Sequence, residues 1–140
     1  MDFGVSESVW KVEFIPDDHL LYLRVHMGWF RKDGRVAPGF FKNRPDEHTG
    51  AMSTDWSKYS TPHETRARAR KPAENAVGQL GVSEVRRIPE QTVIHSPIQF
   101  DDFLPDNRAH TDVRGPKEDT DLDVQDQFTR ICRIVLQVDS

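Results

Sequence analysis

Apolar and polar residues alternate with the two-residue period of a β-strand in two segments near the N-terminus. In residues 8–15 the large apolar side chains fall on every second position, and the same period returns in residues 21–27. Successive side chains of a strand point to opposite faces, so each segment is expected to bury one face. The intervening Pro16-Asp17-Asp18 sequence is typical of a turn. The pattern therefore predicts a hairpin of two antiparallel strands.

Regular alternation is lost over residues 28–60. Turn-forming residues recur there, and large apolar side chains are spread among them: Trp29, Phe30, Phe40, Phe41, Met52 and Trp56. A loop of this length is unusual in a compact domain and is often functional. We expect a long loop that these side chains fix to the body of the domain. The alternative is that they simply belong to the core.

A short helix is predicted over residues 61–70. Thr61 is placed to cap it, Pro62 occupies the first helical position, and Glu64 follows the cap by three residues, as in a capping box. Pro72 disfavours helical geometry at the residue before it, so the helix should end at about Arg70.

The rest of the pattern predicts short strands at 77–82, 92–95 and 108–114 and a helical turn at 83–86. A helix over 121–136 is indicated by apolar residues at helical spacing: Val124, Phe128, Ile131 and Val135. A chain of 140 residues fits one domain, here 1–140. The order of elements predicts an α+β fold, with a largely antiparallel sheet of about five strands and the C-terminal amphipathic helix packed on one face.

Composition bears on the compartment. The one cysteine, Cys132, has no partner for an internal disulfide, and the N-terminus lacks the basic and apolar regions of a secretion signal. Apolar runs stay well short of the ~18 residues of a membrane span. We therefore expect a cytoplasmic protein without membrane association.

The formal net charge is −4, and the charges are unevenly distributed. Residues 66–87 hold six Lys or Arg against two Glu, whereas residues 101–126 hold nine Asp or Glu against three basic residues. Such polarity favours a protein partner or head-to-tail self-association over nucleic acid, whose phosphates the acidic segment would repel. Alternatively, the two segments interleave in the fold and their charges cancel.

The densest polar chemistry lies in residues 107–115. With a strand period, Arg108, His110 and Asp112 share one face with Arg114. A histidine beside a carboxylate can act as a general base, and His95 lies in the preceding predicted strand. One hypothesis is therefore a catalytic set of His95, His110 and Asp112, with Arg108 binding an anion. The competing interpretation is a solvated strand face with weak ion pairs.

Other chemistry receives no support from the sequence. The six histidines lack the spacing of metal ligands, and no glycine-rich phosphate loop is present, so we expect neither a metal nor a cofactor. No candidate nucleophile accompanies the histidines, because Cys132 falls in the last predicted helix and is expected to be a small buried residue.

Several sequence blocks also suggest a source. They are Leu-Arg-Val-His at 23–26, Trp-Phe-x-x-Asp-Gly-Arg-Val at 29–36, Met-Ser-Thr-Asp-Trp at 52–56, Thr-Pro-His-Glu-Thr at 61–65, Val-Ser-Glu-Val-Arg at 82–86 and Asn-Arg-Ala-His-Thr-Asp-Val at 107–113. In their order, from Leu20 to Gly115, the chain resembles a group of short bacterial proteins of unassigned function. The resemblance implies a bacterial origin and carries no activity.

The first functional hypothesis is a non-enzymatic interaction protein, an accessory subunit of a bacterial multi-component system. Aromatic residues and arginine supply most of the energy of protein interfaces. The expected contact residues are Trp29, Phe30, Phe40, Phe41, Arg66 and Arg70. The alternative is a small hydrolase or phosphotransfer-type enzyme that uses His95, His110 and Asp112.

Overall fold

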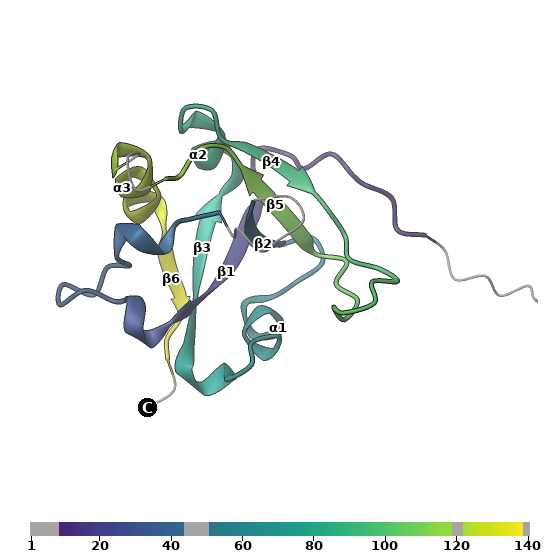
Figure 1. Ribbon diagram of the computed structural model, residues 1–140, viewed down its shortest axis with the longest axis horizontal. Helices are drawn as coiled ribbons and strands as arrows, with labels where there is room; N and C mark the ends of the chain where they lie inside the picture. Colours follow the sequence, from purple (N-terminus) through teal and green to yellow (C-terminus); the bar gives the residue numbers. More distant parts are fainter. Residues whose placement is uncertain (1–8, 44–50, 119–121, 139–140) are drawn as a thin grey trace, which may run out of the picture.

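The computed structural model describes residues 9–43, 51–118 and 122–138, and within them the strands form one antiparallel sheet (Figure 1). The strands follow the order β4-β5-β2-β1-β3-β6. They are β1 (Leu20–His26), β2 (Met52–Trp56), β3 (Asn75–Gly81), β4 (Thr92–His95), β5 (His110–Arg114) and β6 (Arg133–Leu136). The predicted α+β class is confirmed, with six strands in the described part of the chain rather than about five.

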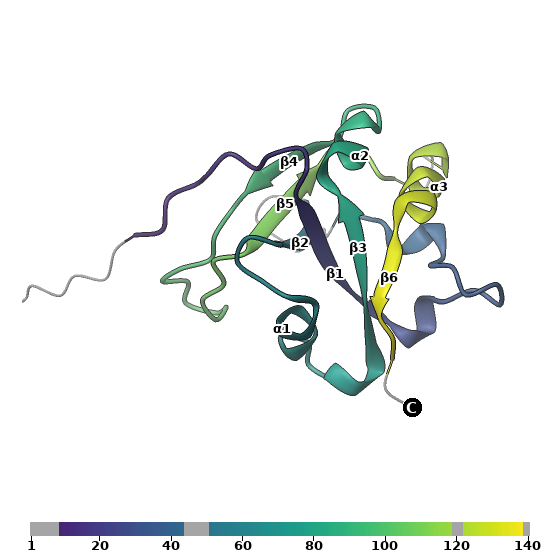
Figure 2. The same ribbon diagram turned by 180° about the vertical axis from the view of Figure 1, so that it is seen from behind.

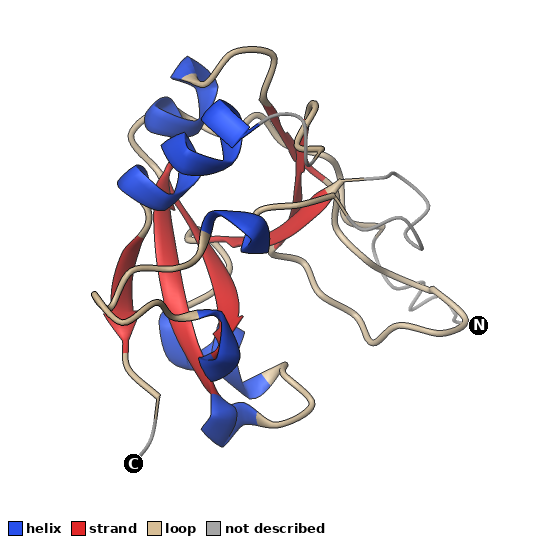
Figure 3. Ribbon diagram, turned by 60° about the vertical axis from the view of Figure 1, so that its left-hand side comes forward, coloured by secondary structure: helices blue, strands red, loops and turns tan. Residues whose placement is uncertain are grey.

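In the described residues, three α-helices accompany the sheet: α1 (Pro62–Ala67), α2 (Val82–Arg87) and α3 (Leu122–Ile131). The same residues contain three short 3-10 helices, η1 (Met27–Trp29), η2 (Pro38–Phe40) and η3 (Pro72–Glu74). Figures 1 and 3 show that the three α-helices lie near the two ends of the strands, with α2 and α3 at one end and α1 at the other. The capping box of α1 is confirmed, since Thr61 Oγ1 accepts from Glu64 N–H and the Glu64 carboxylate accepts from Thr61 N–H.

The predicted N-terminal hairpin is wrong. Residues 9–15 form no strand and lead away from the sheet past β4 (Figures 1 and 2), and residues 1–8 lie outside the described part. Both edges of β1 are occupied by other strands, because Leu21 pairs with Trp56 of β2 and with Leu80 of β3. The long pairing with β3 leaves no free edge for a hairpin partner.

The predicted loop at 28–60 contains a central strand. Within it, Met52–Trp56 forms β2, which pairs with β1 on one edge and with β5 on the other. This segment is only five residues long and follows a stretch rich in turn residues, so its alternation is too short to predict a strand.

The C-terminal helix is shorter than predicted. It ends at Ile131, and Arg133–Leu136 forms β6, an edge strand that pairs with β3 through a register shift between Val77 and Gly78. The close approach needs a glycine, because a Cβ at Gly78 would lie 2.7 Å from Cys132 Sγ. Tertiary pairing thus overrides the helical period at the end of this segment.

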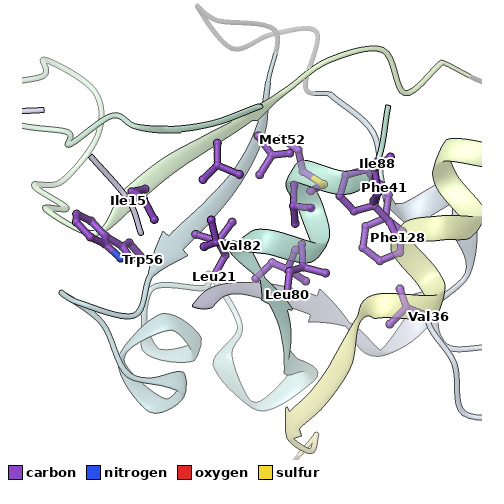
Figure 4. Close-up of a cluster of buried hydrophobic side chains, with 14 of the residues drawn as sticks. Ile15, Leu21, Val36, Phe41, Met52, Trp56, Leu80, Val82, Ile88 and Phe128 are labelled. Carbon is purple, nitrogen blue, oxygen red and sulfur yellow. The ribbon is translucent and has the colours of Figure 1, made fainter. Parts of the chain in front are cut away.

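One face of the sheet forms the hydrophobic core. Alternate residues of the central strands, such as Leu21, Met52 and Leu80, point to this side and form one buried cluster with Val82 of α2 (Figure 4). The ring of Phe128 in α3 stacks on Phe41, with centroids 5.3 Å apart. This packing fixes the sheet against α2 and α3 and leaves its other face for polar side chains.

A buried lysine joins the end of β5 to the α3 region. Lys117 is only 1% exposed, and its Nζ donates to Asn43 Oδ1 at 2.7 Å, Val113 O at 2.9 Å and Gly115 O at 3.2 Å. All three acceptors are uncharged, so none of them offsets the loss of hydration with a negative charge. Burial therefore lowers the pKa of Lys117 from 10.5 to about 8.

This lysine should make stability rise at alkaline pH. Between about pH 8 and 10.5 the unfolded chain holds the Lys117 proton while the folded chain has released it, so the free energy of unfolding increases with pH. The free energy of unfolding of wild type minus that of Lys117→Met should therefore increase by on the order of 3 kcal/mol across this interval. Urea unfolding at successive pH values measures it.

One control variant and one cancellation make the measurement specific to Lys117. Lys32→Met, which removes an exposed lysine, controls for the loss of one positive charge. Burial raises the pKa of Cys132 to about 12, which acts in the opposite direction but cancels between wild type and variant. A difference that stays flat or falls above pH 8 would contradict the assignment.

Candidate functional site

A cavity of about 250 Å³, lined by both polar and apolar residues, opens on the sheet face opposite the core. Its floor comes from three adjacent central strands, and its walls come from α1 and from the loop between β4 and β5. The floor residues are Tyr22, Arg24, Ser53, Asp55 and His110. The wall residues include Thr65, Arg68, Ile98, Leu104, Pro105, Asp106 and Asn107. We call this site the polar cavity.

Strand register explains why the floor side chains share one face. Tyr22 of β1 lies opposite Asp55 of β2, which lies opposite His110 of β5, so the three form a row across the sheet. Ser53 lies opposite Asp112 in the next row along the strands. Residues two apart on a strand point the same way, so both rows face the cavity side.

The Asp55 carboxylate holds the cavity together. It is 5% exposed, and its Oδ2 accepts from Thr65 Oγ1 and from Arg68 Nη1, each at 2.8 Å. Its Oδ1 accepts from Asn107 Nδ2 at 2.9 Å. Arg68 Nη1 also lies 2.9 Å from Ser60 Oγ. One carboxylate of β2 therefore fixes both walls, the α1 side through Thr65 and Arg68 and the loop side through Asn107.

His110 is oriented by two polar contacts. Its Nδ1 lies 2.9 Å from the Ser96 carbonyl oxygen, and its Nε2 lies 3.2 Å from Ser53 Oγ. A carbonyl can only accept, so Nδ1 carries the proton and Nε2 is left to accept from the Ser53 hydroxyl. The Asp112 Oδ1 is 3.9 Å from Nδ1, beyond hydrogen-bond distance, and Arg114 Nη2 donates to Asp112 Oδ2 at 3.1 Å.

The second histidine of the catalytic hypothesis lies elsewhere. His95 pairs with Thr111, the neighbour of His110, and therefore points to the opposite face of the sheet. Its ring is 1% exposed and packs against the rings of Trp56 and Tyr59. Its Nε2 donates to the Arg108 carbonyl at 2.7 Å, and its Nδ1 accepts from Glu13 N–H at 3.0 Å. The structure does not bring His95 and His110 into one site.

Arg108 also lies outside the cavity, beside the N-terminal segment. Its guanidinium sits 4.4 Å from the centre of the Tyr59 ring and 3.9 Å from a Glu13 carboxylate oxygen. The same carboxylate accepts from Lys58 Nζ at 2.6 Å and from the Tyr59 hydroxyl. These hydrogen bonds, from Lys58 first, lower the pKa of Glu13 and hold this segment against the domain.

The predicted aromatic contact surface is only partly exposed. Phe41 is fully buried, and Phe30 and Phe40 are half-buried against the core. Trp29 is 41% exposed and makes a T-shaped ring contact with Phe40. Of the predicted arginines, Arg66 donates to the Gln137 carbonyl at 3.0 Å and Arg70 is exposed; neither lines the polar cavity.

Within the described ranges, no three His, Cys, Asp or Glu side chains gather as they would around a metal ion. No helix in that part of the chain is both long and apolar enough to cross a membrane. Comparisons with protein-family models, curated proteins and solved structures return no match. The function must therefore be argued from the cavity itself.

We expect Asp55→Asn to destabilise the fold by roughly 2–4 kcal/mol, because the Arg68 guanidinium loses its carboxylate and one amide oxygen cannot accept from all three donors. The midpoint of urea unfolding should fall with an unchanged slope. Asp33→Asn, which alters an exposed carboxylate paired with Arg31, is the matched control and should change stability far less. Equal losses in both variants would show that Asp55 has no special role.

Proposed function

We propose that this protein binds a small polar ligand in the polar cavity. The observation that carries the proposal is the Asp55 carboxylate, which fixes α1 and the β4–β5 loop around an open space while Ser53 and His110 face that space. Ligand sites are concave, largely formed in advance and furnished with a few placed polar groups. A carboxylate that only stabilised the fold would not need a cavity beside it.

The lining indicates the class of ligand. The floor presents the Ser53 hydroxyl, the His110 imidazole and the Arg24 guanidinium as hydrogen-bonding groups. Leu104 and Pro105 give the loop wall an apolar edge. The cavity lies just below the usual ~300–1,000 Å³ range of ligand pockets, which suits a compact molecule with several hydrogen-bonding groups.

A thermal-shift screen of small polar metabolites tests this proposal. A ligand present at 100 times its Kd should stabilise the protein by about 2.7 kcal/mol. His110→Ala should weaken binding of the same ligand roughly tenfold or more, because it removes a cavity hydrogen-bond partner. His63→Ala is the control, since His63 is an exposed residue of α1 that does not line the cavity. Ligands that bind both variants equally well would place the site elsewhere.

A second candidate, a protein-interaction role as an accessory subunit of a bacterial system, is favoured by the β4–β5 loop. Phe100, Phe103 and Leu104 are 58%, 91% and 43% exposed. The loop is nevertheless well formed: Ile98 and Asn107 are bridged, and Asp101 Oδ2 accepts from the backbone N–H groups of Phe103 and Leu104. A shaped loop that exposes large apolar side chains is typical of a contact surface.

Phe103→Ser should leave thermal stability unchanged within roughly 0.5 kcal/mol, because the ring is almost fully exposed. The same variant should lose a partner that the wild type captures from the native host. An Arg66→Ala/Arg70→Ala variant, in the originally expected contact region, provides the comparison. Loss of the partner only in the arginine variant would assign the contact to α1 instead of the loop.

A further inference from the structure

We propose that Ser53 and His110 form a nucleophile and general-base pair that acts on a small ester bound in the polar cavity. This inference rests on the proposed ligand-binding function and adds a reaction to it. Neither residue needs to move far, because Ser53 Oγ and His110 Nε2 are already 3.2 Å apart on adjacent strands. An adjacent general base is the usual way in which a serine hydroxyl becomes nucleophilic.

The tautomer of His110 is the one a base requires. The Ser96 carbonyl accepts the Nδ1 proton at 2.9 Å, which leaves the Nε2 lone pair directed at the Ser53 hydroxyl. The side chain of His110 is 14% exposed, so the ring is held by its surroundings and still reaches the cavity. A base oriented by a third group is the arrangement expected of such sites.

The positive charge that develops on the His110 ring lies near a carboxylate. When Nε2 takes the serine proton, the imidazolium lies 3.9 Å from the Asp112 carboxylate, whose side chain is 2% exposed. Arg114 Nη2 lies 3.1 Å from the same carboxylate, which weakens the field that Asp112 exerts on the imidazolium. At this distance Asp112 acts as a positioning residue through the field it exerts on the imidazolium, since it makes no hydrogen bond to the ring.

The reaction follows ordinary acyl transfer. Ser53 Oγ bonds to the ester carbonyl carbon as its proton passes to His110 Nε2, and the carbonyl electrons move to oxygen. The C–O bond to the alcohol then breaks, and the alcohol leaves with the Nε2 proton. Water repeats the two steps and releases the acid, restoring Ser53 and His110. The Arg24 guanidinium lines the same cavity and supplies positive charge for the intermediate oxyanion.

A fluorophosphonate probe tests this assignment, because Ser53 Oγ would bond to phosphorus with loss of fluoride. Intact-protein mass spectrometry should show one adduct, mapped to Ser53 by digestion. Ser53→Ala should abolish labelling, and His110→Ala should slow it at least 100-fold, within the range expected for a general base. Ser83→Ala is the control: Ser83 lies on α2, outside the cavity, and its loss should leave labelling unchanged.

A cysteine variant guards against misfolding as an explanation. In Ser53→Cys, iodoacetamide should alkylate position 53, and adding His110→Ala should slow that reaction, because the thiol then lacks its base. The native Cys132 should not compete, since burial raises its pKa to about 12. Equal rates with and without His110 would overturn the pairing.

The outcomes separate this inference from the proposed function. A protein that binds cavity ligands but gives no adduct at Ser53, or labels equally fast in His110→Ala, overturns catalysis and leaves ligand binding intact. A Ser53 adduct that depends on His110 supports catalysis. Failure of every compound to bind the cavity overturns the binding proposal and, with it, the turnover of a bound ester, and an adduct would then show only that Ser53 is activated.

Discussion

The polar side of this domain depends on one buried carboxylate. Asp55 sits on a central strand, yet its hydrogen-bond donors come from α1 and from the β4–β5 loop. Those two segments do not otherwise belong to the core, and α1 is short and rich in polar residues. A charge at this depth is tolerated only when its oxygens are fully paired. The requirement to pair Asp55 therefore shapes the cavity.

Local sequence signals predicted the elements that local chemistry determines. The capping box of α1 and the strand at 92–95 are both present. The wrong predictions concern elements whose structure depends on tertiary pairing. Residues 9–15 alternate as a strand should, but β2 and β3 occupy both edges of β1. Residues 133–136 continue a helical period and yet pair with β3. Alternation of apolar and polar residues indicates that one face of a strand is buried. It does not determine which strand becomes its neighbour in the sheet.

The sequence predicts part of the candidate site. His110 and Asp112 stand out because they lie in a dense polar strand, and the expectation that they share a face is met. The sequence pattern predicts a loop over residues 52–56, and a loop gives the side chains of Ser53 and Asp55 no fixed direction. Read as a strand, their two-residue spacing would have placed both on one face. That they face His110 follows only from the register of β2 with β5, which no local pattern encodes.

Two of the buried charged side chains in the described residues, Lys117 and Asp55, are stabilised in different ways. Lys117 is surrounded by uncharged oxygens beside the core and its pKa falls, as expected of a group that burial penalises. Asp55 is paired with a guanidinium and lies at the edge of an open cavity. A structural cation can be enclosed completely, as Lys117 is. The pairing of Asp55 encloses the carboxylate but leaves an open cavity beside it, in which Ser53 and His110 meet.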